Sequence, residues 1–209
     1  DGSWKDLTQI KNSSPDLSPN CAQMPRLLGL AYASKLYRQN PGLKELAGFS
    51  DNGNEIAFGT IGDSATSEGM FFETMNAAGV LQVPMLVSVW DDGYGISVPR
   101  HYQTTKDNIS EVLQGFQRTK DKDGYEIFTV LGWNYEGLCK IYRKAEKICR
   151  KEHVPVLIHV QEMTQPQGHS TSGSHERYKS KERLQWEDDF DPIRKMRDWI
   201  LNNEYATAE

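Results

Sequence analysis

Acidic side chains stand directly after two strongly apolar runs of the sequence. Asp63 closely follows the run Glu55–Ile61, and the pair Asp91-Asp92 follows Met85–Trp90. If both runs are strands of one parallel sheet, these carboxylates leave the same edge of that sheet. Mg²⁺ takes oxygen ligands and keeps only a few from protein, while phosphate oxygens and water complete its shell. The acidic residues could therefore hold a divalent cation beside a phosphate group.

The segment that follows Asp63 supports two interpretations. Ser64–Glu68 leads towards a helix, and the unpaired amides of a helix start favour an anion such as phosphate. Alternatively, Asp63 caps that helix and Asp92-Gly93 is only a turn, because these residue types are common in both roles. From these residues alone, the cap and turn are the simpler interpretation, and cation binding is the alternative to it.

A serine hydrolase is a further possibility, with Ser64 of the Gly62-Asp63-Ser64 block as the nucleophile. Such a serine needs a base, which hydrolases of this kind usually supply from an Asp-x-x-His sequence. No aspartate stands three residues before any of the histidines, which are His101, His153, His159, His169 and His175. The G-x-S-x-G nucleophile elbow is absent from the sequence as well. The residues therefore favour a metal site over a hydrolase.

Alternating apolar runs and helical patterns predict the elements that position these residues. The predicted strands are Glu55–Ile61, Met85–Trp90, Glu126–Leu131 and Val154–Glu162, and the predicted helices are Ala22–Tyr37, Ser67–Leu81, Ile109–Gly115 and Glu136–Lys151. Continuously apolar strands that alternate with helices indicate an α/β fold, a doubly wound parallel sheet with helices on both faces. In such a sheet, ligands bind beyond the carboxyl ends of the strands.

Composition limits the classes of protein to which the chain can belong. Its 209 residues suit a single domain, with 37% hydrophobic and 25% charged residues, as in a water-soluble globular protein. The net charge of -5 argues against nucleic-acid binding, and no apolar run is long enough to span a membrane. The three cysteines form no C-x-x-C pair. We expect a cytoplasmic protein and, because the sequence does not begin with methionine, a fragment of a longer chain.

The block GDSATSEGMFFETMNAAGVLQVPMLVSVWDDGYGISVP, Gly62–Pro99, resembles a family motif. The motif is that of the alpha-type half of the thiamine diphosphate-dependent first component of 2-oxo acid dehydrogenase complexes. Cys21–Lys35 is similar to the family's cofactor-side helix, Gly168–Ser172 to its GHSTS loop, and Asp191–Ile193 to the start of its late helix. The resemblance covers nearly the whole chain in the right order and implies the thiamine diphosphate-binding fold.

For the metal, the resemblance implies a Mg²⁺ site built from two side chains and one backbone group. Asp63 takes the position of the first ligand, Asp92 that of the second, and the carbonyl of Tyr94 supplies the third. Where the family has an asparagine, this sequence has Asp92, which adds one negative charge. A carboxylate is an ordinary magnesium ligand, so we expect the site to tolerate it.

For the cofactor, the resemblance implies contacts from the same turn and from the long loop. Gly62, Ser64 and Ala65 are the positions that meet the diphosphate, the latter two through backbone amides, and His169 approaches the diphosphate and the reacting carbon. Ser64 replaces the family's third glycine, and its hydroxyl can donate to a phosphate oxygen.

The resemblance implies decarboxylation of a 2-oxo acid and transfer of the acyl group to lipoyl. Within the resemblance, details of the sequence favour a branched-chain substrate such as 2-oxoisovalerate. If the source is eukaryotic, we expect the enzyme in the mitochondrial matrix. The implied partners are a beta-type subunit or fused half and a lipoyl-bearing acyltransferase, so this chain alone should be inactive. The alternative from another class is a non-catalytic scaffold subunit that has lost cofactor affinity, to which the Ser64 and Asp92 departures point.

The predicted organisation is a single domain in four consecutive parts. An extended lead-in covers residues 1–20 and the α/β core covers 21–163. A mobile active-site loop then covers 164–180, and a helical segment covers 181–209. The loop contains His169 and few apolar residues, so burial offers little to offset the entropy of ordering it.

Overall fold

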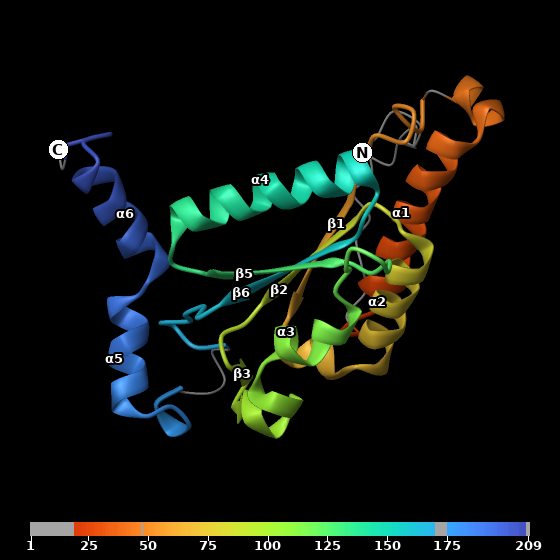
Figure 1. Cartoon of the computed structure of the whole chain (residues 1–209). Coiled ribbons are helices and arrows are strands. Elements are labelled where there is room, and N and C mark those ends of the chain that lie inside the picture. Colours follow the sequence, from red (N-terminus) through yellow and green to blue (C-terminus); the bar gives the residue numbers. More distant parts are fainter. Residues whose placement is uncertain (1–18, 47, 170–174, 208–209) are drawn as a thin grey trace, which may run out of the picture.

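A parallel sheet covered by helices on both faces forms the core of the molecule. The computed structural model describes residues 19–46, 48–169 and 175–207. Its sheet has the order β1-β2-β6-β5, with β1 at Ala57–Gly62, β2 at Met85–Trp90, β6 at Val156–Gln161 and β5 at Glu126–Leu131. Every pairing in this sheet is parallel. In Figure 1, α4 (Tyr135–Glu152) lies across one face of the sheet, and α1 (Gln23–Gln39) and α2 (Gly69–Leu81) lie against the other. The predicted α/β fold is confirmed.

Apolar side chains on both sides of the strands explain why helices cover both faces of the sheet. Met85, Val87 and Val89 of β2 belong to the apolar cluster that includes residues of α1 and α2, whereas Leu86 belongs to the cluster beneath α4. Successive side chains of a strand point to opposite faces, so a strand that is apolar throughout must be buried on both. β2 therefore lies in the centre of the core.

The helices follow the sequence pattern closely. Their bounds are α1 Gln23–Gln39, α2 Gly69–Leu81, α3 Ile109–Val112, α4 Tyr135–Glu152, α5 Lys181–Asp189 and α6 Pro192–Asn202. The Asn134 side chain accepts the Gly137 amide at the start of α4, and Ser180 and Asp191 cap α5 and α6 in the same way. These caps satisfy amides that would otherwise lack partners, so local sequence specifies where α4, α5 and α6 begin.

Two strands start two residues later than the sequence predicted, and for β6 the reason is the proline that precedes it. β1 starts at Ala57, whose amide donates to the Pro84 carbonyl at 2.9 Å, and β6 starts at Val156, directly after Pro155. Proline has no amide to give to a ladder. The sequence analysis also missed a small antiparallel sheet of β3, Tyr94–Gly95, and β4, Val98–Pro99.

The predicted division of the chain remains a prediction. Most of the predicted lead-in and residues 170–174 of the predicted loop lie outside the described residues. The predicted helical segment contains α5 and α6. Within the part of the chain that is described, no helix combines the length and the apolar character needed to cross a bilayer.

Candidate functional site

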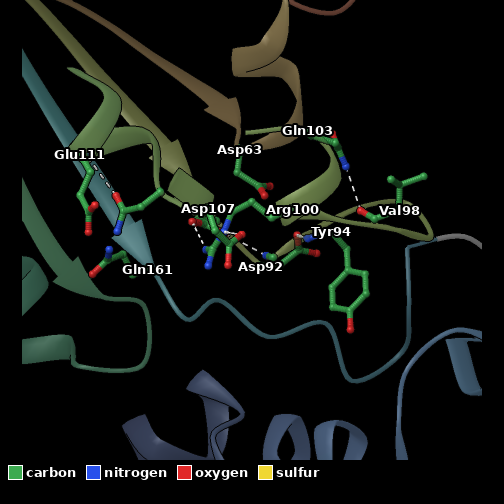
Figure 2. Close-up of polar contacts among 12 residues, drawn as sticks. Asp63, Asp92, Tyr94, Val98, Arg100, Gln103, Asp107, Glu111 and Gln161 are labelled. Carbon is green, nitrogen blue, oxygen red and sulfur yellow. Dashed lines mark hydrogen bonds and ion pairs between the residues drawn. The ribbon is translucent and has the colours of Figure 1, made fainter. Parts of the chain in front are cut away.

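The acidic residues that the sequence singled out lie at one edge of the sheet. Gly62 pairs with Trp90 at the ends of β1 and β2, and the Asp63 amide donates to the Trp90 carbonyl at 3.0 Å. Asp92 stands two residues beyond Trp90. Figure 2 shows the Asp63 side chain pointing from the end of β1 towards the loop that carries Asp92 and Arg100. The prediction that Asp63 and Asp92 leave the same sheet edge is confirmed.

Asp63 is buried, and its carboxylate has an incomplete set of hydrogen bonds. Its side chain makes no capping hydrogen bond to the 3-10 turn Ser64–Ser67, so the helix-cap interpretation is wrong. Its Oδ2 atom is buried and has no hydrogen-bond partner among the described residues. Burial raises the pKa of Asp63 to about 8, and the carboxylates of Asp91 and Asp92 add to this shift. Buried oxygens of this kind usually have a partner, and a bound cation would supply one.

Asp92 and Tyr94 belong to one tight turn after β2. The Asp92 Oδ1 atom accepts the Tyr94 amide at 3.1 Å, and Gly93 has the left-handed φ of +82° that favours glycine. Asp92-Gly93 is therefore a turn, as one interpretation held. Burial raises the pKa of Asp92 as well. The hydrogen bond uses one carboxylate oxygen and leaves the other for a ligand.

Ser64 fits the turn because a glycine faces it. A Cβ atom built on Gly95 would lie 2.9 Å from the Ser64 Cβ, closer than real Cβ contacts come. The extra carbon of Ser64 thus occupies space that Gly95 leaves open. Ser64 and Ala65 lie in the short 3-10 turn, and α2 begins only at Gly69, two residues later than predicted.

A buried network under the turn was missed by the sequence analysis. Asp91, which is 1% exposed, accepts Arg100 Nη1 at 2.5 Å, His159 Nε2 at 2.7 Å and the Gly93 amide at 2.9 Å. Arg100 also pairs with Asp107 at 2.9 Å. Burial alone would raise the pKa of Asp91, but hydrogen bonds and charge from His159 and Arg100 hold it below its usual range. The signal in the sequence was a histidine inside an apolar strand.

The same histidine contacts a serine, yet the arrangement is not that of a hydrolase. His159 Nδ1 lies 3.0 Å from Ser110 Oγ, and its Nε2 faces Asp91, the reverse of the ring orientation in catalytic triads. Ser110 and His159 are both buried, and Ser110 also bonds Asn108 at 2.8 Å. Across the described residues, no histidine hydrogen-bonds the Ser64 hydroxyl. The hydrolase alternative therefore has no support at either serine.

His169 lies in the segment that follows β6. It is exposed at the end of the described segment after β6, and the last three residues of the GHSTS loop, 170–172, lie outside the described residues. The Tyr178 side chain contacts the backbone of His169, and its ring centroid lies 5.9 Å from that of Tyr94. No hydrogen bond or ion pair in the described part of the chain joins His169 to Asp63 or Asp92. Its place at the site stays a prediction.

The donor set fits a cation that brings ligands of its own. Asp63 and Asp92 offer carboxylate oxygens, and the turn offers backbone carbonyls. The described residues contain no group of three or more His, Cys, Asp or Glu side chains arranged around a common metal position. Mg²⁺ that is bound with a phosphorylated ligand needs no such group, because phosphate and water fill its shell. The oxygen donors of this edge are therefore compatible with Mg²⁺ that brings phosphate oxygens and water as further ligands.

Comparison with known proteins places the chain among dehydrogenases. A family model described as "Dehydrogenase E1 component" matches residues 8–209. The mitochondrial 2-oxoisovalerate dehydrogenase subunit alpha 1 of Arabidopsis thaliana is 27% identical over 194 residues, which are 92% of this chain and 36% of that protein. The corresponding subunit of Mus musculus is 30% identical over 195 residues, 92% of this chain and 39% of the relative.

Relatives that act on another substrate are equally similar. The pyruvate dehydrogenase E1 component subunit alpha of Rickettsia bellii is 28% identical over 189 residues, which are 89% of this chain and 50% of that protein. The chain therefore spans half or less of the length of these relatives.

Proposed function

Because the chain belongs to the dehydrogenase E1 component family, we propose that it is the alpha-type part of a 2-oxo acid dehydrogenase and binds Mg²⁺ and thiamine diphosphate at this sheet edge. The observation that carries the proposal is the buried, unpartnered Oδ2 of Asp63 beside the turn of Asp92. Burial raises the pKa values of both carboxylates, so their ionised forms are unfavourable in the absence of a cation.

The residues of the edge divide the binding between them. Asp63, Asp92 and the Tyr94 carbonyl hold the cation, and the backbone of Gly62, Ser64 and Ala65 approaches the diphosphate. When bound, thiamine diphosphate supplies the electron sink that decarboxylation of a 2-oxo acid requires. The protein orients it and neutralises its charge. His169 reaches the site from the loop after β6 and approaches the reacting carbon.

A second polypeptide or fused half completes the enzyme. A beta-type partner shares the active site, and the acyl group passes to a lipoyl-bearing acyltransferase. Branched-chain 2-oxo acids are the proposed substrates, supported by Thr66–Gly69, Gly95–Pro99 and the GHSTS loop. The chain alone lacks activity, and the enzyme works in the cytoplasm or, in a eukaryote, in the mitochondrial matrix.

Calorimetric titration separates this enzyme role from a scaffold role. The full chain is titrated with thiamine diphosphate at saturating Mg²⁺, with and without the beta-type partner. The proposal predicts saturable heat in the presence of the partner and little heat when Mg²⁺ is replaced by a chelator. Absence of binding in the assembled pair contradicts the proposal and favours the scaffold subunit.

A further inference from the structure

A cluster of charged side chains on α5 and directly before it contacts the Asp92–Tyr94 turn. Arg183 Nη2 donates to the Asp92 carbonyl at 2.6 Å, a contact between residues 91 positions apart. The Arg183 guanidinium lies 5.5 Å from the centroid of the Tyr94 ring and 4.7 Å from that of Trp186. The side chain is therefore held between its own helix and the turn.

Glu187 fixes Arg183 in this position. Its Oε1 atom accepts Arg183 Nε at 2.7 Å, and the same carboxylate accepts Lys179 Nζ at 2.7 and 2.9 Å. The side chains of Glu187 and Lys179 are 0% and 2% exposed. Lys179 Nζ also lies 5.1 Å from the centroid of the Tyr94 ring. The charged groups of Arg183 and Lys179 thus both lie against the turn, and the buried Glu187 carboxylate orients both side chains.

Buried ion pairs often contribute little net stability, and in some proteins their role is to fix one arrangement of the chain. Here the arrangement that is fixed is the backbone of Asp92 and the ring of Tyr94. Arginine suits this task because its planar fork can bond a carboxylate and a carbonyl at once, whereas lysine offers a single ammonium group. The cluster therefore acts on the turn by geometry more than by charge.

We propose that Arg183, oriented by Glu187, is a positioning residue that holds the Asp92–Tyr94 turn in the form that receives the metal. This inference rests on the proposed function for its metal, but the contact between Arg183 and the turn stands without it. Arg183 is the residue to substitute, because Glu187 would keep both of its bonds to Lys179. Removal of Glu187 would instead leave Lys179 buried without a counter-charge.

The test compares Arg183→Ala and Arg183→Lys with a control, Arg194→Ala, in the full chain assembled with its beta-type partner. Arg194 of α6 pairs with Asp188 of α5 at 3.0 Å, and no hydrogen bond or ion pair among the described residues joins it to the turn. The first readout is deuterium uptake of a peptide that covers Asp92–Val98 without cofactor. The second is the dissociation constant of thiamine diphosphate at fixed Mg²⁺.

Arg183→Ala should raise the uptake and weaken cofactor binding about tenfold, which corresponds to about 1.4 kcal/mol. Arg183→Lys should lose most of the affinity despite its retained charge, and Arg194→Ala should change neither readout. Unchanged uptake, or raised uptake with unchanged affinity, overturns the inference. If the unsubstituted protein binds no cofactor, the proposed function fails, and the uptake alone decides whether Arg183 holds the turn.

Discussion

The amide of Asp63 donates to the carbonyl of Trp90 at 3.0 Å, one residue beyond the last pair of the β1–β2 ladder. This bond sets the ends of the two strands level with each other. Asp63 is the first residue after β1, and Asp92 is the second residue after Trp90, which ends β2. The two carboxylates interact electrostatically because the strands are parallel neighbours, and a cation would relieve the repulsion between them.

Asp92→Asn should separate metal binding from cofactor binding. Asparagine keeps the Oδ1 atom that accepts the Tyr94 amide, so the turn should remain intact. It removes one negative charge, which attracts Mg²⁺ but repels the diphosphate. At an effective dielectric constant near 20, the two effects largely offset each other and leave about 1 kcal/mol. Calorimetry should find weaker Mg²⁺ binding without cofactor, and unchanged or tighter thiamine diphosphate binding at saturating Mg²⁺. A large loss of cofactor affinity would contradict the charge argument.

Much of this edge could be predicted from the sequence, because its signals are local. An apolar run that ends in an aspartate predicts both a strand and the side chain beyond it, and Met85–Trp90 and Glu126–Leu131 were predicted with the bounds that the structure has. The turn at Asp92-Gly93 is likewise predicted by the types of two adjacent residues. These features depend on the backbone preferences of a few adjacent residues.

Contacts between distant segments could not be predicted in this way. Asp91 and His159 are 68 residues apart, and Arg183 and the Asp92 carbonyl are 91 apart. Their meeting depends on the strand order, which places β6 beside β2, and on the path of the chain to α5. A histidine in an apolar strand signals that a polar partner exists, but not which residue it is.

Glycine at position 95 should be required only while Ser64 is present. Gly95→Ala places a Cβ 2.9 Å from the Ser64 Cβ, and also near the movable end of Gln103. Overpacking of this kind typically costs about 1–3 kcal/mol in the free energy of unfolding. Ser64→Gly should recover most of that loss in the double variant, and denaturant unfolding of the four proteins measures the coupling. Strictly additive effects would show that the two residues do not compete for space.

His159 should contribute more to stability than its serine partner. His159→Phe leaves buried Asp91 with one hydrogen bond fewer and should lower the free energy of unfolding by roughly 2–4 kcal/mol. Ser110→Ala removes hydrogen bonds to His159 and Asn108 but leaves the Asp91 carboxylate with its partners, and it should cost about 1–2 kcal/mol. Urea denaturation of both variants makes the comparison. Equal stability of the two would mean that the Asp91–His159 contact contributes little.

The most direct test of the account is thiamine diphosphate binding by Asp63→Ala in the assembled enzyme, at saturating Mg²⁺ and with the unsubstituted protein and Ser110→Ala as controls. Asp63 brings the buried oxygen that lacks a partner, so its removal takes away a metal ligand and leaves the diphosphate without an anchored counter-ion. The account predicts that calorimetry detects no cofactor binding by Asp63→Ala, while both controls bind. Binding by Asp63→Ala as tight as that of the unsubstituted protein would contradict the site.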